Sequence, residues 1–299
     1  MKTFEAMPAS AERFLLGEGP VWDAPRGRLL WIDIDDGAVL IGRLDGDRVQ
    51  VEDRLDFAGT VGAVTVAADG RLLVAAEREL VLVDLDGSRS RVQSLIPDTE
   101  QRRLNDGKTD PVGRFLVGTC PTAERAQAEW LKRIEHDGSV TTIDTGLGLS
   151  NGLAWSCDGS RFYSIDSFRH VVWVRDYDPE TGAFGERSAF VRIEDGYPDG
   201  MCSDAEDHVW IAVYGCGEVR RFSPQGQLVA AVRLDVPQTT SVAFAGPERD
   251  ILIITTAGRG LTPEELIEYP DSGRLFTARV GVQGAPTAFA FGMGDEAYG

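Results

Sequence analysis

Short apolar runs, each preceded by a polar turn, recur along the whole chain. Residues 23–27 form the first turn and lead into the apolar run 29–32, and residues 68–70 lead into the run 72–75. Runs of this length, bounded by Gly, Pro and Asp, are typical of buried β-strands rather than of helices. Aligned on these runs, the following residues are equivalent: Leu30, Leu73, Leu116, Tyr163, Trp210 and Leu252.

The aligned residues lie 42 to 47 positions apart, and each interval holds further short strands. One example is the run 80–83, which is followed by another turn. A period of this size with several strands per unit is the signature of a β-propeller. We therefore predict an all-β fold, a six-bladed β-propeller of four-stranded antiparallel blades, with residues 1–299 as a single domain.

The ring of blades must be closed, because an open sheet edge invites aggregation. We expect an N-terminal strand near residues 13–16 to complete the last blade. Thr262, Pro263 and Glu265 have the N-cap, N1 and N3 pattern of a short helix. The Gly- and Ala-rich segment 284–299 is expected to be a loose tail.

The net charge of −18 argues against nucleic acid as a partner and is compatible with cation binding. The chain shows no signal peptide and no apolar stretch long enough for a membrane span, so we expect a cytoplasmic protein with no membrane partner. Its four cysteines include no CxxC pair, which favours reduced thiols. A Cys157–Cys202 or Cys202–Cys216 disulfide is the less favoured alternative.

The innermost strand of each blade should begin eleven or twelve residues before the aligned position. Inner strands run beside the central channel, so side chains at their starts can converge on one face. The residues at these places are Glu18, Val61, Asn105, Asn151, Asp199 and Thr240.

Four of these side chains carry a carboxylate or amide oxygen, and each of the four is followed by Gly at one or two positions: Glu18, Asn105, Asn151 and Asp199. Asn-Gly and Asp-Gly are also ordinary turn dipeptides, which is the competing interpretation of each pair alone. Four at the same phase of one repeat favour a site. Two carboxylates and two amide oxygens suit a hard divalent cation such as Ca²⁺, Mg²⁺ or Mn²⁺, and suit Zn²⁺ less well.

Two further side chains are candidates for substrate binding. Arg103 lies two residues before Asn105, hence on the same face of an extended strand. Glu124 lies in a long polar loop, where a solvated charge is the competing interpretation. The three histidines fall in turns away from the strand starts, so a serine–histidine mechanism lacks its base.

These motifs together resemble the SMP-30/gluconolactonase/regucalcin-like family of six-bladed propellers. The motifs that carry the resemblance, from about residue 14 to residue 280, include 16–22 (LGEGPVW), 103–108 (RLNDGK), 150–154 (SNGLA) and 197–201 (YPDGM). The resemblance implies a divalent-metal site at Glu18, Asn151 and Asp199, with Ca²⁺ favoured and Zn²⁺, Mn²⁺, Mg²⁺ or Fe²⁺ as alternatives. It also implies substrate binding by the following residues: Arg103, Asn105 and Glu124.

The function expected from this resemblance is the hydrolysis of a sugar lactone to its aldonic acid by a monomer or small homo-oligomer. A cation would polarise the lactone carbonyl, and Asp199 would act as the acid/base group. Two alternatives remain open: a calcium-dependent phosphotriesterase of the diisopropyl-fluorophosphatase type, and a non-catalytic calcium-binding propeller.

Overall fold

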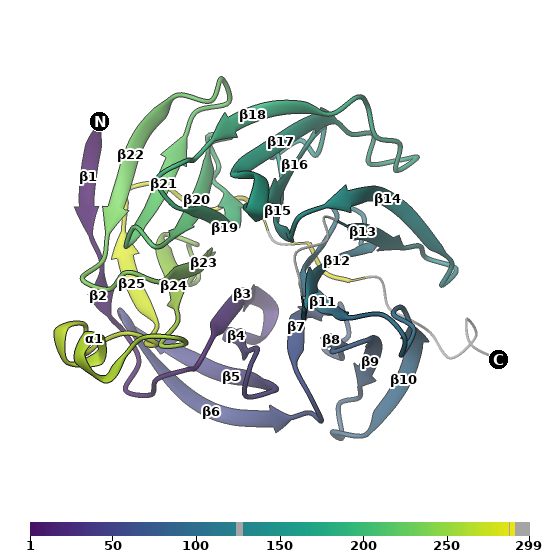
Figure 1. The fold of residues 1–299 in the computed structure, drawn as a ribbon, viewed down its shortest axis with the longest axis horizontal. Helices are drawn as coiled ribbons and strands as arrows, with labels where there is room; N and C mark the ends of the chain where they lie inside the picture. Colours follow the sequence, from purple (N-terminus) through teal and green to yellow (C-terminus); the bar gives the residue numbers. More distant parts are fainter. Residues whose placement is uncertain (124–127, 287, 291–299) are drawn as a thin grey trace.

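Six antiparallel sheets stand around a central axis in the computed structural model, which describes residues 1–123, 128–286 and 288–290 (Figure 1). The prediction of a six-bladed β-propeller is confirmed. The strands nearest the axis are β3 (Gly17–Asp23), β7 (Val61–Val66), β11 (Arg102–Thr109), β15 (Ser150–Trp155), β19 (Tyr197–Ser203) and β23 (Thr239–Ala245).

Each inner strand is followed outward by two or three further strands. The second strands are β4 (Arg28–Asp33), β8 (Leu72–Ala76), β12 (Phe115–Pro121), β16 (Arg161–Asp166), β20 (Val209–Tyr214) and β24 (Ile251–Thr256). The third are β5 (Ala38–Asp45), β9 (Glu79–Val83), β13 (Glu129–Ile134), β17 (Val171–Asp176), β21 (Glu218–Phe222) and β25 (Phe276–Arg279). The fourth strands of the first five blades are β6 (Arg48–Asp56), β10 (Arg89–Ser94), β14 (Val140–Leu147), β18 (Ser188–Arg192) and β22 (Leu228–Arg233).

The aligned apolar residues lie on the second strands and fill the core between blades. All six are at most 2% exposed. Leu30 and Ile32 of the first blade, for example, pack in one cluster with Val64 and Val74 of the second. Burial of such apolar faces between neighbouring blades is the main force that holds the ring together.

The chain closes the ring from its N-terminus, but not with the predicted segment. Strand β2 (Met7–Pro8) pairs antiparallel with β25 and completes the sixth blade. The prediction of residues 13–16 is wrong, because only Leu16 makes a strand-like bridge, to Ala257. The unpredicted strand β1 (Lys2–Glu5) adds a fifth, parallel strand to the fifth blade beside β22.

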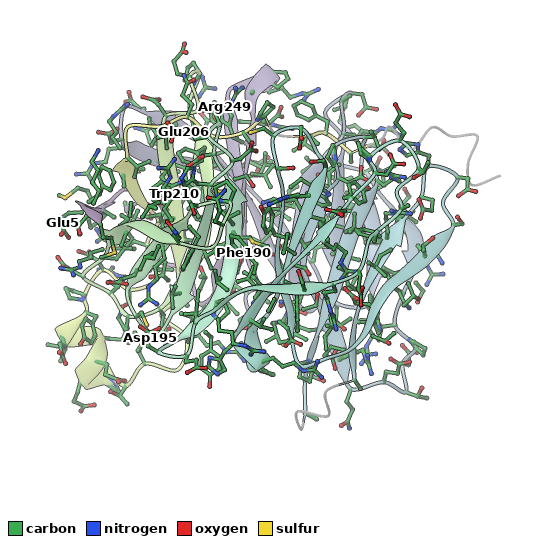
Figure 2. All side chains as sticks on the ribbon, turned by 90° about the horizontal axis from the view of Figure 1, so that it is seen from above. Glu5, Phe190, Asp195, Glu206, Trp210 and Arg249 are labelled. Atoms are coloured by element: carbon green, nitrogen blue, oxygen red, sulfur yellow. The ribbon has the colours of Figure 1, made fainter. Side chains whose placement is uncertain are left out.

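The inner strands all run from one face of the ring to the other. Figure 2 shows Asp195, which precedes β19, near one face, whereas Glu206 and Arg249, in turns that follow inner strands, lie near the opposite face. We call these the start face and the turn face.

Part of the C-terminal segment is fastened across the turn face. Backbone N–H groups of Gly284, Ala285 and Ala290 donate to carbonyl groups of Arg249, Ser203 and Val66, at 2.8, 3.1 and 2.8 Å. These residues of the segment expected to be a loose tail are thus hydrogen-bonded to the turn ends of β19 and β7 and to the turn between β23 and β24. Residues 291–299 lie outside the described part of the chain.

The expected short helix is present as α1 (Pro263–Glu268), with a capping box between Thr262 and Glu265. All four cysteines are free thiols. Among the described residues, no helix is long and apolar enough to cross a membrane.

Candidate metal and substrate site

The strand starts bring the predicted oxygen-bearing side chains together at the axis. Glu18, Asn105 and Asn151 are buried on β3, β11 and β15, and Asp199 is partly buried on β19. Asn105 Nδ2 lies 3.4 Å from Asn151 Oδ1, and Asn151 Nδ2 donates a short hydrogen bond to Asp199 Oδ1. Side chains from three different blades therefore contact one another in one cluster.

Burial and mutual repulsion dominate the electrostatics of the two axial carboxylates. Burial, followed by the charges of Asp199 and Asp106, raises the pKa of Glu18 well above its ordinary value. Burial, followed by the charge of Asp106, likewise raises the pKa of Asp199. Like charges held close together in a low-dielectric interior oppose each other's ionisation.

Asp106 is a member of this cluster that the sequence analysis missed. Burial raises its pKa to about 6, against the opposing charge of Lys108 and a hydrogen bond from the Gly107 N–H. Its place next to Asn105 suggested only a turn, although a third carboxylate at the same strand start was a usable signal.

The two amides of the cluster present opposite ends to the axis. Asn105 Oδ1 accepts a hydrogen bond from Arg103 Nη1 at 2.7 Å, and Asn105 Nδ2 donates to the Ser150 carbonyl at 2.9 Å. Asn151 instead uses Nδ2 for Ser167 Oγ, at 3.1 Å, as well as for Asp199. Asn105 is thus an N–H donor toward its neighbours, whereas Asn151 keeps its Oδ1 as an acceptor.

This donor set fits a divalent cation. Glu18, Asn151 and Asp199 supply two carboxylates and one amide oxygen that faces the cluster, which are hard ligands suited to Ca²⁺ or Mg²⁺. Burial first, and repulsion between neighbouring carboxylates second, raise the pKa of both carboxyls, and a bound cation would oppose both effects. Within the described ranges, no group of three or more His, Cys, Asp and Glu side chains has metal-binding geometry, so this site depends on the Asn oxygen.

Arg103 is buried on β11 beside Asn105, and its role in substrate binding stays a prediction. Its side chain is only 8% exposed, and Nη1 contacts both Asn105 Oδ1 and the Leu104 carbonyl, at 2.7 and 2.9 Å. Glu124 falls at 124–127, outside the described residues, so its place in the site stays a prediction.

Other polar side chains lie around the cluster or away from it. Burial and the charge of Asp199 raise the pKa of Tyr214, so its ring lies near the cluster. Lys108 Nζ donates to the Met201 carbonyl at 2.8 Å. The histidine rings bond to backbone carbonyls in turns: His136 to Val112, His170 to Ile193 and Gly196, and His208 to Glu206.

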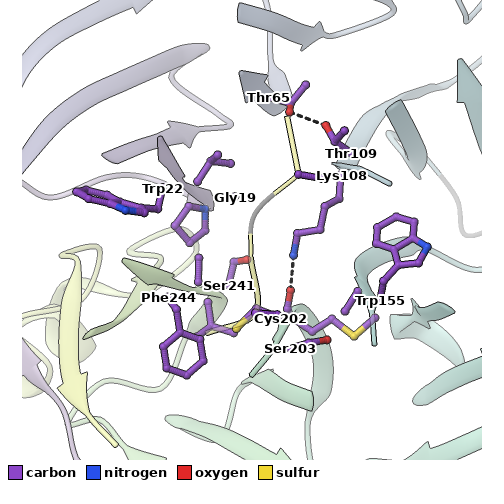
Figure 3. A pocket seen from close by; sticks show the side chains of 18 of the residues that line it. Gly19, Trp22, Thr65, Lys108, Thr109, Trp155, Cys202, Ser203, Ser241 and Phe244 are labelled. Carbon is purple, nitrogen blue, oxygen red and sulfur yellow. Dashed lines mark hydrogen bonds between the residues drawn. The ribbon is translucent and has the colours of Figure 1, made fainter. Parts of the chain in front are cut away.

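A cavity of about 340 Å³ fills the channel toward the turn face, beyond the cluster (Figure 3). Lys108, Thr65 and Thr109 line it, and the two threonine hydroxyls bond to each other at 2.7 Å. Ala285 and Pro286 of the C-terminal segment also line it. The cavity and the cluster therefore lie one after the other along the axis, with the cluster nearer the start face.

Comparison with known proteins gives one consistent family. Residues 16–258 match the model of the family described as SMP-30/Gluconolactonase/LRE-like region. Regucalcin of Xenopus laevis is 34% identical over 292 residues, which cover 94% of this chain and 96% of that protein. Pentonolactonase XacC of Haloferax volcanii is 38% identical over 247 residues, which cover 81% of this chain and 82% of that protein.

A solved structure agrees with both. The crystal structure of a calcium-binding protein, regucalcin, from Agrobacterium tumefaciens superposes with a TM-score of 0.88 at 26% identity, covering 97% of this chain and 99% of that one. The likeness thus includes the whole ring as well as the sequence motifs.

Proposed function

Since the chain belongs to the SMP-30/gluconolactonase/LRE-like family, we propose that it hydrolyses a sugar lactone to the corresponding aldonic acid. The observation that carries the proposal is that oxygen ligands and a separate N–H donor lie side by side at the axis. Three oxygen ligands, Glu18, Asn151 and Asp199, lie beside a separate donor, Asn105, whose orientation Arg103 holds. A protein that only binds a cation needs the ligands but not the donor pair.

The similarity to a pentonolactonase supports a five-carbon lactone among the substrates. Glu18, Asn151 and Asp199 would hold one divalent cation, with Ca²⁺ favoured because the ligands are hard oxygens and a similar structure is described as calcium-binding. When bound, this cation would polarise the lactone carbonyl.

The chain's own residues would perform the proton transfers. Asp199 accepts a proton from the water that attacks the carbonyl carbon, and it returns that proton to the ring oxygen when the C–O bond breaks. Asn105 Nδ2 donates to the carbonyl oxygen as negative charge develops there. Arg103 holds Asn105 in this orientation and adds a positive charge toward the substrate.

The test is an assay of acid release on pentono- and hexonolactones after the protein is stripped with a chelator. We expect activity to return with a single divalent cation and Asp199→Ala to lower kcat by about 10²–10⁴-fold. Asp195→Ala is the matched control, because that side chain is 62% exposed and lies four positions before Asp199. Full activity of Asp199→Ala with saturating metal would overturn the assignment.

The same assay separates the alternatives. Hydrolysis of organophosphates without that of any lactone would indicate a phosphotriesterase. Cation binding without turnover of either class would indicate a binding protein, and each of these results would contradict the proposal.

A further inference from the structure

Ser167 links the two inner strands that carry Asn151 and Asp199. It follows β16 in a short 3₁₀ turn (Ser167–Arg169) and is 3% exposed. Its Oγ lies 2.6 Å from the Pro198 carbonyl oxygen, on β19, and 3.1 Å from Asn151 Nδ2, on β15.

These two contacts determine which end of the Asn151 amide faces the serine. A carbonyl oxygen only accepts, so the single hydroxyl proton of Ser167 is used for Pro198. Toward Asn151, the hydroxyl oxygen can then only accept. The amide must present Nδ2 to Ser167, and its Oδ1 then faces the axial cluster, where it lies 3.4 Å from Asn105 Nδ2.

A second contact holds the backbone on which this amide sits. Asp166 is fully buried and accepts hydrogen bonds from the N–H groups of Gly148 and Leu149, at 3.1 to 3.2 Å, just before Asn151. Asp33 does the same in the first blade, where the N–H groups of Leu15 and Leu16 donate to it at 2.8 and 3.0 Å, just before Glu18. With the backbone fixed in this way, the remaining freedom of Asn151 is the orientation of its amide.

We propose that Ser167 is a positioning residue that fixes the Asn151 amide with Oδ1 toward the axis and thereby makes it a cation ligand. This inference rests on the proposed function, because it assumes that the axial cluster binds a divalent cation. It adds a residue outside the ligand set, from the end of a second strand, whose role is to select one of two amide orientations.

The test measures the Ca²⁺ dissociation constant of metal-free protein by titration calorimetry. Ser167→Ala removes one of the two acceptors of the Asn151 NH₂ group, leaving only Asp199 Oδ1, so the amide is held less firmly with Oδ1 toward the axis. We expect Ca²⁺ to bind about 10–100-fold more weakly, the range usual when a group that orients a metal ligand is lost. Should Ser167→Ala fail to fold, Ser167→Cys, with a thiol that accepts only weakly, is expected to give the same loss.

Repeating the measurement in the Asn151→Asp variant distinguishes a loss of amide orientation from a general disturbance of the metal site. In Asn151→Asp the side chain has two equivalent oxygens and no orientation to select. There, adding Ser167→Ala should leave Ca²⁺ affinity unchanged or strengthen it, because the serine oxygen would face a carboxylate. Ser203→Ala is the matched control: Ser203 is a buried serine on β19 whose Oγ has no hydrogen-bond partner among the described residues, so Ca²⁺ affinity should stay within twofold.

The possible results distinguish an error in the positioning role of Ser167 from an error in the metal site itself. If wild type binds Ca²⁺, Asn151→Ala does not, and Ser167→Ala binds like wild type, the positioning role is overturned and the metal site stands. An equal loss from Ser167→Ala in the Asn151 and Asn151→Asp backgrounds also overturns it. If wild type binds no divalent cation at all, the proposed metal site fails and the inference fails with it.

Discussion

Arg103 Nη1 donates a hydrogen bond to Asn105 Oδ1 at 2.7 Å in the buried centre of the ring. Because the amide oxygen is used by Arg103, Asn105 can offer only N–H toward the axis. Asn151, on the neighbouring blade, has the reverse arrangement. Two chemically identical side chains at the same phase of the repeat are therefore oriented differently, which supports the proposal that one is a donor and the other an oxygen ligand.

Replacing Asn105 should separate these roles. We expect Asn105→Ala to lower kcat on a lactone by about 10²–10³-fold, the usual cost of losing one donor to a developing oxyanion, with Ca²⁺ affinity within about threefold of wild type. Steady-state kinetics and calorimetry on the same preparation would check both values. A variant that lost Ca²⁺ binding in proportion to activity would instead identify Asn105 as a ligand.

The raised pKa of Asp106 predicts a pH dependence of stability in the metal-free protein. The folded state holds this proton up to about pH 6, whereas an unfolded Asp loses it near its ordinary pKa of 3.8. The stabilisation is thus full below about pH 4 and is lost as the pH rises through 6. Asp106→Asn mimics the protonated form, so relative to wild type it should gain about 2–3 kcal/mol of unfolding free energy between pH 4.5 and 7.5.

Urea denaturation at these two pH values, with chelator present, would measure that gain. Asp98→Asn serves as the control, because Asp98 is an exposed carboxylate in a loop of the second blade. A gain of the same size in Asp98→Asn, or no gain in Asp106→Asn, would contradict the assignment of a burial penalty to the Asp106 carboxylate.

The sequence was sufficient to place the blades and the axial oxygen side chains, because both depend on the repeat. Buried apolar runs recur at a nearly constant interval, and the inner strand lies at a fixed distance before each run. Glu18, Asn151 and Asp199 could be aligned in this way without knowledge of any contact. The amide orientations could not, since they depend on Arg103 and Ser167, and Ser167 reaches the axis from the end of a second strand.

The closing strand was misplaced for a related physical reason. The segment 13–16 has apolar residues at alternate positions, Phe14 and Leu16, as a strand would. The Phe14 ring instead packs edge-on against the Trp31 ring, with 5.6 Å between the ring centroids, where the chain enters the first blade. Pairing by Met7–Pro8 extends over only two residues, which is too short to produce an alternating pattern. Such a strand is defined by the edge that it covers rather than by its own sequence.

A buried clasp between the third and fourth blades should be important for stability but not for activity. Asp110 is fully buried and accepts from Arg114 Nε and from the Tyr177 hydroxyl, both at 2.6 Å. Tyr177→Phe removes two hydrogen bonds to charged groups, the one that its hydroxyl donates to Asp110 and the one that it accepts from Arg114 Nη2 at 2.9 Å. We expect it to lower the free energy of unfolding by at least about 1.5–3 kcal/mol. Kinetic constants measured well below the melting temperature should be unchanged.

Tyr269→Phe is the matched control for this clasp, since its hydroxyl lies at the surface near Glu268 and should contribute little. Equal destabilisation by both variants would show that the hydrogen bond between Tyr177 and Asp110 adds nothing particular to the free energy of unfolding. A fall in kcat for Tyr177→Phe alone would instead connect the clasp to the site.

Removal of the N-terminal strands should expose two sheet edges one after the other. Deletion of residues 1–5 removes β1 and uncovers β22 of a blade that is already four-stranded, whereas deletion of residues 1–8 also removes β2 and opens the sixth blade at β25. An unpaired edge is a template for association with another chain. We therefore expect the longer deletion to lower Tm further and to form aggregates in size-exclusion chromatography, while the shorter one stays monodisperse with its lactonase kinetics unchanged. Equal Tm and equal elution of the two truncated proteins would show that the Met7–Pro8 pairing does not close the ring.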